Sequence, residues 1–229
     1  MTGVIDLKSA TIRDLNSRLQ DAASAPEGSV WHVANVRGHH SVAVGIDRPL
    51  TVEVEGNTGY FTAGMNHGAE ITVKGNAGQG VAETMSAGKV HVTGDASMAA
   101  GASGRGGLLV IDGNAAARCG ISMKGIDIVV KGDVGHLSAF MAQTGRLVVL
   151  GDAGESLGDS IYEARLYVRG AVTSLGADCI EKPLRDEHRA ELAGLLAAAG
   201  VTDVPVDAFR RYGSARDLYH FKVDNAGAY

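Results

Sequence analysis

The sequence predicts an all-β solenoid, a right-handed parallel β-helix of about seven 19-residue coils with helical N- and C-terminal extensions. Three features predict this fold: a glycine that recurs in strict register, an apolar triplet before each glycine, and columns of small residues after it. A 19-residue unit is too short for a βαβ unit, which needs about 30 residues, or for a propeller blade of about 40. We therefore divide the chain into an N-terminal helix and cap (residues 1–48), the β-helix (49–180) and a C-terminal helical extension with a tail (181–229).

The recurring glycine is followed by Asn or Asp in all copies but the last, where Ala follows. We expect the glycine to supply a positive φ at the corner after each strand. The Asn or Asp can bond its own turn, and Asn can stack on its copies as a ladder. Calcium binding is the alternative, but the known calcium repeat is a nonapeptide with denser Gly and Asp. The glycines, 19 residues apart throughout, are Gly56, Gly75, Gly94, Gly113, Gly132, Gly151 and Gly170.

Each glycine is preceded by a triplet whose outer residues are always apolar, which is the alternation of a half-buried strand. The middle residue is often polar in the early triplets. The triplets are residues 52–54, 71–73, 90–92, 109–111, 128–130, 147–149 and 166–168. Two columns of small residues indicate a narrow interior or closely packed backbone. They are Thr58, Ala77, Ala96, Ala115, Val134, Ala153 and Val172, and Ala63, Ala82, Gly101, Gly120, Ala139 and Gly158.

The segment before the repeat predicts an amphipathic helix over residues 6–22, with Thr11 as a possible cap. Residues 30–46 hold two short apolar stretches that lead into the first coil. We expect this segment to cap the open end of the column, because repeat arrays need atypical ends to hide their edges.

The segment after the repeat predicts a second helix over residues 183–199, which Gly200 ends. Residues 205–211 suggest a further short helix. The tail from residue 214 to 229 has an extended, partly exposed character and would be available to a partner.

Charge, hydropathy and cysteine content exclude several classes of protein. The net charge is −5, from 21 basic and 26 acidic residues without a basic stripe, which argues against nucleic-acid binding. No apolar run approaches the length of about 18 residues that a membrane span needs, and no signal peptide is recognisable. The two cysteines, Cys119 and Cys179, support no disulfide scaffold, iron–sulfur cluster or Cys-rich zinc site. We expect a cytoplasmic protein.

The sequence shows no catalytic constellation, and we predict no catalytic, cofactor-binding or metal-binding residue. Cys119 follows Arg118, which would lower the pKa of an exposed thiol, but its place in the repeat favours packing. Residues 101–107 resemble a dinucleotide fingerprint only superficially, since they belong to the coils and open no helix. No metalloprotease-type histidine spacing occurs among His39, His40, His67, His91 and His136.

Several large apolar side chains fall away from the strand columns. A contiguous apolar flank would mark a protein–protein surface, and burial in the coil interior is the alternative. These residues are Phe61, Met65, Met85, Met123, Phe140, Met141 and Ile161.

Three runs, at residues 60–66, 117–125 and 158–164, resemble the glycine-rich repeat domain at the C-terminal end of the glutamate synthase large subunit. The resemblance covers about residues 30–180. The same domain occurs in one of the chains of formylmethanofuran dehydrogenase. The sequence most resembles the free-standing glycine-rich subunit of N-methylglutamate synthase (methylamine–glutamate N-methyltransferase), an enzyme in which the large subunit is split into three chains.

The resemblance implies a non-catalytic scaffold in a hetero-oligomer. Its partners would be a glutaminase-like (class II amidotransferase) subunit and a synthase subunit that carries FMN and an iron–sulfur cluster, with no cofactor in this chain. A scaffold of a formylmethanofuran dehydrogenase or formyltransferase-type complex is the first alternative. A stand-alone β-helix hydrolase or lyase ranks last, because the Asp residues of the repeat lie in turns and alternate with Asn.

Overall fold

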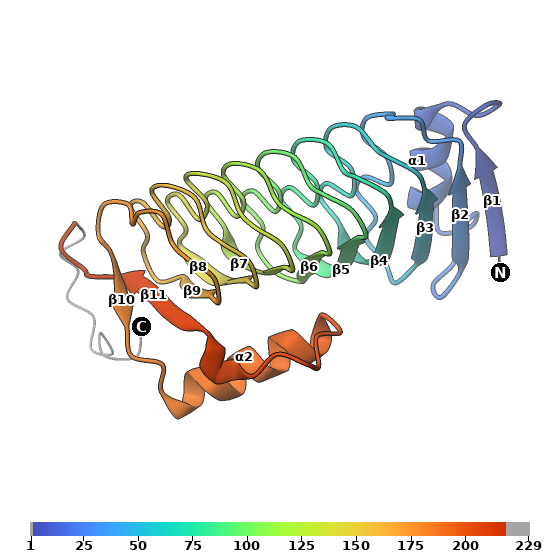
Figure 1. Ribbon diagram of the computed structural model, residues 1–229. Coiled ribbons are helices and arrows are strands. Elements are labelled where there is room, and N and C mark those ends of the chain that lie inside the picture. Colours follow the sequence, from blue (N-terminus) through green and yellow to red (C-terminus); the bar gives the residue numbers. More distant parts are fainter. Residues whose placement is uncertain (1, 219–229) are drawn as a thin grey trace.

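The computed structural model describes residues 2–218, and its strands form one 11-stranded sheet that winds as a solenoid (Figure 1). The strand order is β1 to β9 in sequence, followed by β11 and then β10. Every pairing from β1 to β9 is parallel. The predicted all-β solenoid of about seven turns is therefore confirmed.

The chain contains two α-helices, α1 (Ile12–Gln20) and α2 (Asp186–Ala198), within its described part. One 3-10 turn covers Val206–Ala208. The strands are β1 (Thr2–Asp6), β2 (Val30–Ala34), β3 (Thr51–Glu55), β4 (His67–Lys74), β5 (Ala87–Val92), β6 (Leu108–Ile111), β7 (Lys124–Val130), β8 (Thr144–Val149), β9 (Arg165–Val168), β10 (Cys179–Lys182) and β11 (Arg210–Ser214).

The predicted triplets are strands in the predicted register. Val52 pairs with Ile71, and Ile71 pairs with Val90, each 19 residues further along the chain. The outer side chains of each triplet are buried in the interior, because alternate residues of a strand point to the same face. The first small column forms a second line of bridges from coil to coil, beginning with Ala77 and Ala96.

The ladder of Asn and Asp side chains is present, but it gives the recurring glycine a different role from the expected one. Gly56 has a positive φ of 101°, and the six later glycines of the register do not. Instead, the side-chain oxygen of each Asn or Asp accepts a hydrogen bond from the backbone N–H one coil further on. For example, Asn76 Oδ1 accepts from the Asp95 N–H at 2.9 Å. The side chain lies in close contact with the glycine of the next coil. At Gly132, for example, a Cβ would lie against Asn114 Oδ1 and 2.8 Å from Gly113 O.

The positive φ lies instead in the second small column. All its members have φ between 56° and 70°. The residues two before and two after each member also have positive φ, between 52° and 71°. Left-handed backbone costs about 1 kcal/mol or more per residue other than glycine. Hydrogen bonds between coils offset this cost, for example from Ala82 N–H to Thr62 O at 2.9 Å. Small residues are also required by space, since a Cβ at Gly101 would lie 2.6 Å from Ile128 Cδ1.

The N-terminal segment joins the sheet as well as capping it. The predicted helix start at Asp6 is wrong, because Asp6 ends β1 and its carboxylate accepts the Lys8 N–H at 2.9 Å. Helix α1 begins after Thr11, which forms a capping box with Asp14. Its Leu15 and Leu19 are fully buried in the solenoid core.

The C-terminal segment folds back over the column. Helix α2 and its end before Gly200, whose φ is 72°, are as predicted, but the helix begins at Asp186, three residues after the predicted start. The short helix expected at 205–211 is wrong except for one 3-10 turn at Val206–Ala208. The chain after this turn forms β11, which pairs antiparallel to β9. Strands β11 and β10 cover the edge that the last coil would leave open. The predicted tail lies largely outside the described residues.

Candidate functional site

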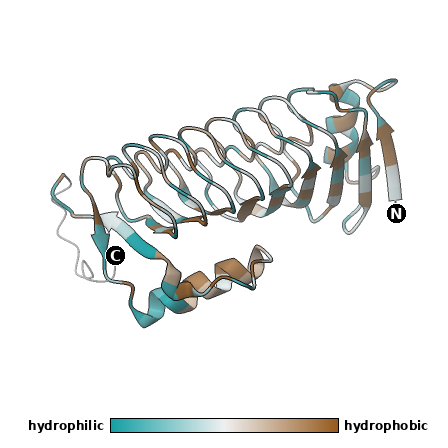
Figure 2. Cartoon of the chain, in the orientation of Figure 1, coloured by the Kyte–Doolittle hydropathy of each residue, from teal (hydrophilic) through white to brown (hydrophobic). Residues whose placement is uncertain are grey.

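Helix α2 divides the outward face of the sheet into a covered part and an uncovered part. In β6 to β9 the middle residues of the triplets are Val110, Val129, Val148 and Tyr167, and they pack against Leu192 and its neighbours on α2. Apolar residues run along much of α2 in Figure 2. The change from polar to apolar middle residues therefore marks the position of the helix.

The uncovered part carries ion pairs between neighbouring coils. Glu53 accepts from Lys74 at 2.8 Å and lies 3.2 Å from His32 Nδ1. His91 Nε2 lies 2.9 Å from Asp112, which also pairs with Lys131 at 2.7 Å. The outward position predicted for His91 is confirmed, and its ring forms a hydrogen bond with Asp112 at the surface.

The other histidines considered in the sequence make separate contacts or are exposed. His40 stacks on Tyr60 with ring centroids 4.5 Å apart, and His67 Nδ1 lies 2.7 Å from Ser86 Oγ. His39 and His136 are exposed. Across residues 2–218, no group of three or more His, Cys, Asp or Glu side chains lies together as a metal site would require.

Both cysteines are packing residues. Cys119 is fully buried while Arg118 is exposed, so the two side chains lie on opposite sides of the coil. Burial raises the pKa of the Cys119 thiol to about 12. Burial, with Asp178 and Asp159 nearby, also raises the pKa of the Cys179 thiol to about 12. The reactive-cysteine alternative has no support in this geometry.

We expect both thiols to resist a disulfide reagent such as Ellman's reagent at pH 8 in the native protein, because neither forms appreciable thiolate. After denaturation both should react, with a stoichiometry of two per chain. Rapid reaction of one thiol in the folded protein would contradict this assignment.

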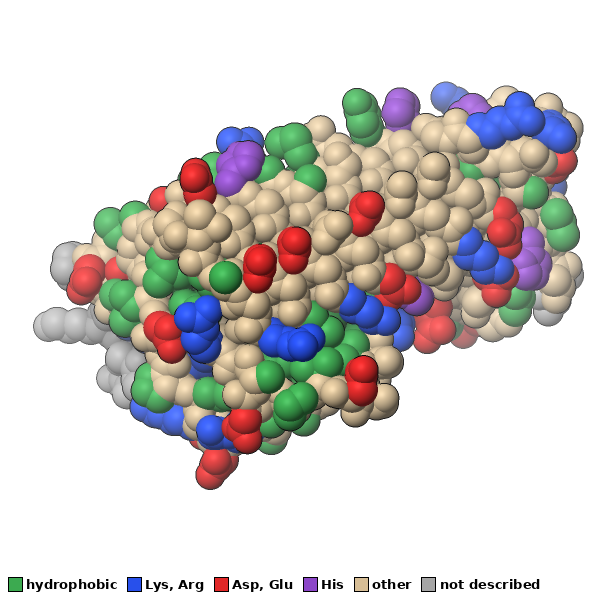
Figure 3. Space-filling view, viewed as in Figure 1, with side chains coloured by type: hydrophobic (Ala, Val, Ile, Leu, Met, Phe, Trp, Pro, Cys, Tyr) green, Lys and Arg blue, Asp and Glu red, His purple; other side chains and the backbone are tan. Residues whose placement is uncertain are grey.

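The large apolar residues do not form one flank. Met85, Met123 and Ile161 are fully buried core residues. Met65 and Met141 are about half exposed, at 51% and 46%. On the face shown in Figure 3, hydrophobic side chains along the upper ridge stand singly among polar and charged ones. Isolated exposed apolar residues of this kind are normal on a protein surface.

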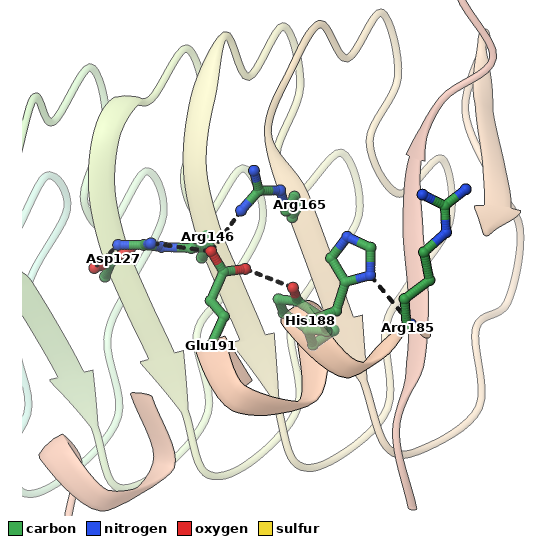
Figure 4. Close-up of polar contacts among 7 residues, drawn as sticks. Asp127, Arg146, Arg165, Arg185, His188 and Glu191 are labelled. Carbon is green, nitrogen blue, oxygen red and sulfur yellow. Dashed lines mark hydrogen bonds and ion pairs between the residues drawn. The ribbon is translucent and has the colours of Figure 1, made fainter. Parts of the chain in front are cut away.

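The densest polar cluster lies where α2 meets β7, β8 and β9 (Figure 4). Arg146 donates to both carboxylate oxygens of Asp127 and, at 3.1 Å, to Glu191 on α2. Arg165 donates to the same Glu191 oxygen, and the Tyr167 hydroxyl donates to the other. We call these five residues the α2 lock.

The two carboxylates and the two guanidinium groups of the α2 lock balance one another in charge. Burial alone would raise the pKa of Glu191, but the Tyr167 hydrogen bond and the two arginines outweigh it and lower the pKa. Burial, together with the hydrogen bond to the same carboxylate, raises the pKa of Tyr167. Glu191 is therefore ionised and fully engaged, and this cluster holds a helix in place rather than offering a base or a nucleophile.

A hollow of about 220 Å³ lies beside the α2 lock at the start of β8 and β9. It is lined by Gly125, Thr144, Gly145, Arg146, Glu163 and Arg165. None of these residues was predicted as a site residue, although Gly125 and Glu163 lie in runs that carry the family resemblance. The recurrence of Arg146 and Arg165 in one column was a visible signal, but the lock depends on where α2 docks.

The comparisons with known proteins agree with this architecture. The model of the GXGXG motif family matches residues 32–189. Protein GlxC of Rhizobium meliloti (strain 1021) is 62% identical over 226 residues, which cover 99% of each chain. Within the described part of the chain, no helix has the length and apolar character needed to cross a membrane. The chain therefore belongs to the GXGXG motif family, the family of the glycine-rich domain at the C-terminal end of glutamate synthase.

Proposed function

We propose that this chain is a non-catalytic scaffold subunit of a glutamate-synthase-like complex. The observation that carries the proposal is the extent of the glycine-rich domain: it matches residues 32–189 of a 229-residue chain. The polar clusters described above are ion pairs that join coils or hold α2, and they leave the chemistry to other chains. FMN and the iron–sulfur cluster would be bound by a partner.

A stacked column suits this role for a physical reason. Its coils are joined by backbone hydrogen bonds on several sides and by the Asn and Asp ladder, so the distance between two points on it varies little. We propose that it holds a glutaminase-like subunit and a synthase subunit at a fixed separation. A fixed geometry would let an amine pass between their sites without loss to solvent.

The finer assignment is N-methylglutamate synthase, in which the amine would be methylamine. It is supported by the resemblance of residues 30–180, together with the helical ends and the moderate acidity of the chain, to a free-standing glycine-rich subunit. The sequence of this scaffold does not choose between methylamine and ammonia, because the residues that bind the amine would be in the partners.

The test is to purify the tagged chain gently from its native host and to record its visible spectrum and its associated subunits. We expect two further chains and a flavin spectrum. A complex prepared without this chain should lose coupled synthase activity by at least tenfold while the glutaminase-like subunit still hydrolyses its own substrate. Full coupled activity without the chain would refute the scaffold role. A colourless chain that purifies alone and acts on an added polymer would favour the hydrolase or lyase alternative.

A further inference from the structure

The hollow beside the α2 lock has the properties of a small binding site. We propose that it takes a small zwitterion of the α-amino-acid class, whose carboxylate binds Arg165 and whose ammonium group binds Glu163. This inference goes beyond the scaffold role and does not depend on it.

The first argument comes from the repeat itself. Arg146 pairs with Asp127 in the preceding coil, and the Nε and Nη2 groups of Arg146 donate to the two oxygens of that carboxylate. Arg165 stands in the same position one coil further on, but its pairing residue in the preceding coil is Arg146. The carboxylate that completes the pattern for Arg146 is therefore missing for Arg165.

The hydrogen bonds of Arg165 agree with a missing acceptor. Its Nη1 donates to Glu191 on α2, while the other terminal nitrogen points away from the helix (Figure 4). Its Nε is buried and has no hydrogen-bond partner within residues 2–218. A buried donor without a partner costs about 1–3 kcal/mol, and a water or ion that accepts from it is one of the recognised explanations. A carboxylate is the group that matches the two-donor edge of a guanidinium.

The second argument concerns the opposite charge in the hollow. Glu163 lines it, and the side chain is only 21% exposed. The carboxylate already forms an ion pair with Arg216, at 3.7 Å from its Nη2, and this separation is too long for a hydrogen bond. An ammonium group near Glu163 would form a charge-assisted hydrogen bond. The Thr144 hydroxyl, which also lines the hollow, can donate or accept.

Charge balance favours a zwitterion over an anion. Within the α2 lock, the charges of Asp127 and Glu191 already balance those of Arg146 and Arg165. A net anion would add an uncompensated charge to a half-buried site, which is costly, whereas a zwitterion adds none. The volume of about 220 Å³ corresponds to roughly seven water molecules, which suits a small amino acid.

Calorimetric titration of the full chain tests the site, with L-alanine as the probe and acetate and methylamine as its two halves. We expect L-alanine to bind at least tenfold more tightly than either half. Arg165→Lys keeps a positive charge for Glu191 but removes the two-donor edge, so it should weaken L-alanine binding at least tenfold. Glu163→Gln should weaken L-alanine by a similar factor and leave acetate nearly unchanged.

Glu70→Gln is the matched control, since Glu70 is exposed on β4 and far from the hollow in the repeat. Far-UV circular dichroism and the melting temperature establish that each variant folds. Should Arg165→Lys release α2, Glu163→Gln still tests the site, because Glu163 is not part of the α2 lock. Three results would overturn the proposal: no binding of L-alanine up to about 20 mM, equal affinities for acetate and L-alanine, or L-alanine binding that both variants leave intact.

Discussion

Gly132→Ala is expected to lower the free energy of unfolding by about 3 kcal/mol, the upper part of the range for overpacking. The new Cβ would lie against the side-chain oxygen of Asn114 and 2.8 Å from Gly113 O. Two layers of the ladder would have to separate, and the Asn114 bond to the Asp133 N–H, 2.8 Å long, would be strained. Urea denaturation followed by circular dichroism measures the loss.

Gly194→Ala is the matched control, because the chemical change is the same and the sign is opposite. Gly194 lies on the exposed side of α2, and a Cβ there would meet nothing within 4 Å. Alanine is the better helix former, so this variant should gain about 0.5–1 kcal/mol. A second check is the Asn114→Ala background, in which Gly132→Ala should cost less because one of its clashes is gone. Equal small effects of both glycine substitutions would show that the ladder does not require glycine.

Glu191→Ala is expected to loosen α2 without unfolding the coils. The substitution leaves Arg146 and Arg165 short of a partner and the Tyr167 hydroxyl buried without an acceptor. Breaking a buried pair costs about 3–5 kcal/mol, and partial exposure of both arginines reduces this to about 2–3 kcal/mol. Hydrogen exchange should speed up tenfold or more in the amides of α2 and little in β3 to β5. Glu187→Ala is the control, since the Glu187 side chain is 65% exposed.

The same contacts make the docking of α2 dependent on pH. The pKa of Glu191 is lower in the folded protein than its ordinary value of 4.5. A carboxyl group of this kind stabilises the fold above its unfolded pKa, and the contribution is lost as the pH falls through the folded pKa. Protection of the α2 amides should therefore be constant from pH 7 to pH 5 and fall below about pH 4.5. Glu191→Gln should remove most of this pH dependence, and an unchanged profile would show that another group controls the docking.

Most of the solenoid could be predicted because its determinants repeat locally. Each coil pairs with its neighbour at a separation of 19 residues, so one register error would misplace every apolar triplet at once. The role of the glycine was harder to predict. A glycine suits both a positive φ and a close approach, and only the position of the Asn114 side chain over Gly132 separates the two.

The part of the sheet that α2 covers could have been predicted from the middle residues of the triplets. The middle residues of the triplets change from Glu53, Thr72 and His91 to Val110 and later apolar residues. This change marks the part of the sheet that α2 covers. The candidate hollow could not be found in this way, since Arg165 and Glu163 look like ordinary surface residues of a coil.

The sequence alone determined the strands of the repeat, their register, the interior of the column and the family, because each of these follows from spacing that recurs along the chain. Only the tertiary structure decided the return of β11 to pair with β9 and the docking of α2 against β6 to β9. Such contacts join segments that occur once and lie tens of residues apart, as Arg146 and Glu191 do. The physical reason is that a single long-range contact leaves no period in the sequence, whereas a stacked repeat records each of its contacts in every coil.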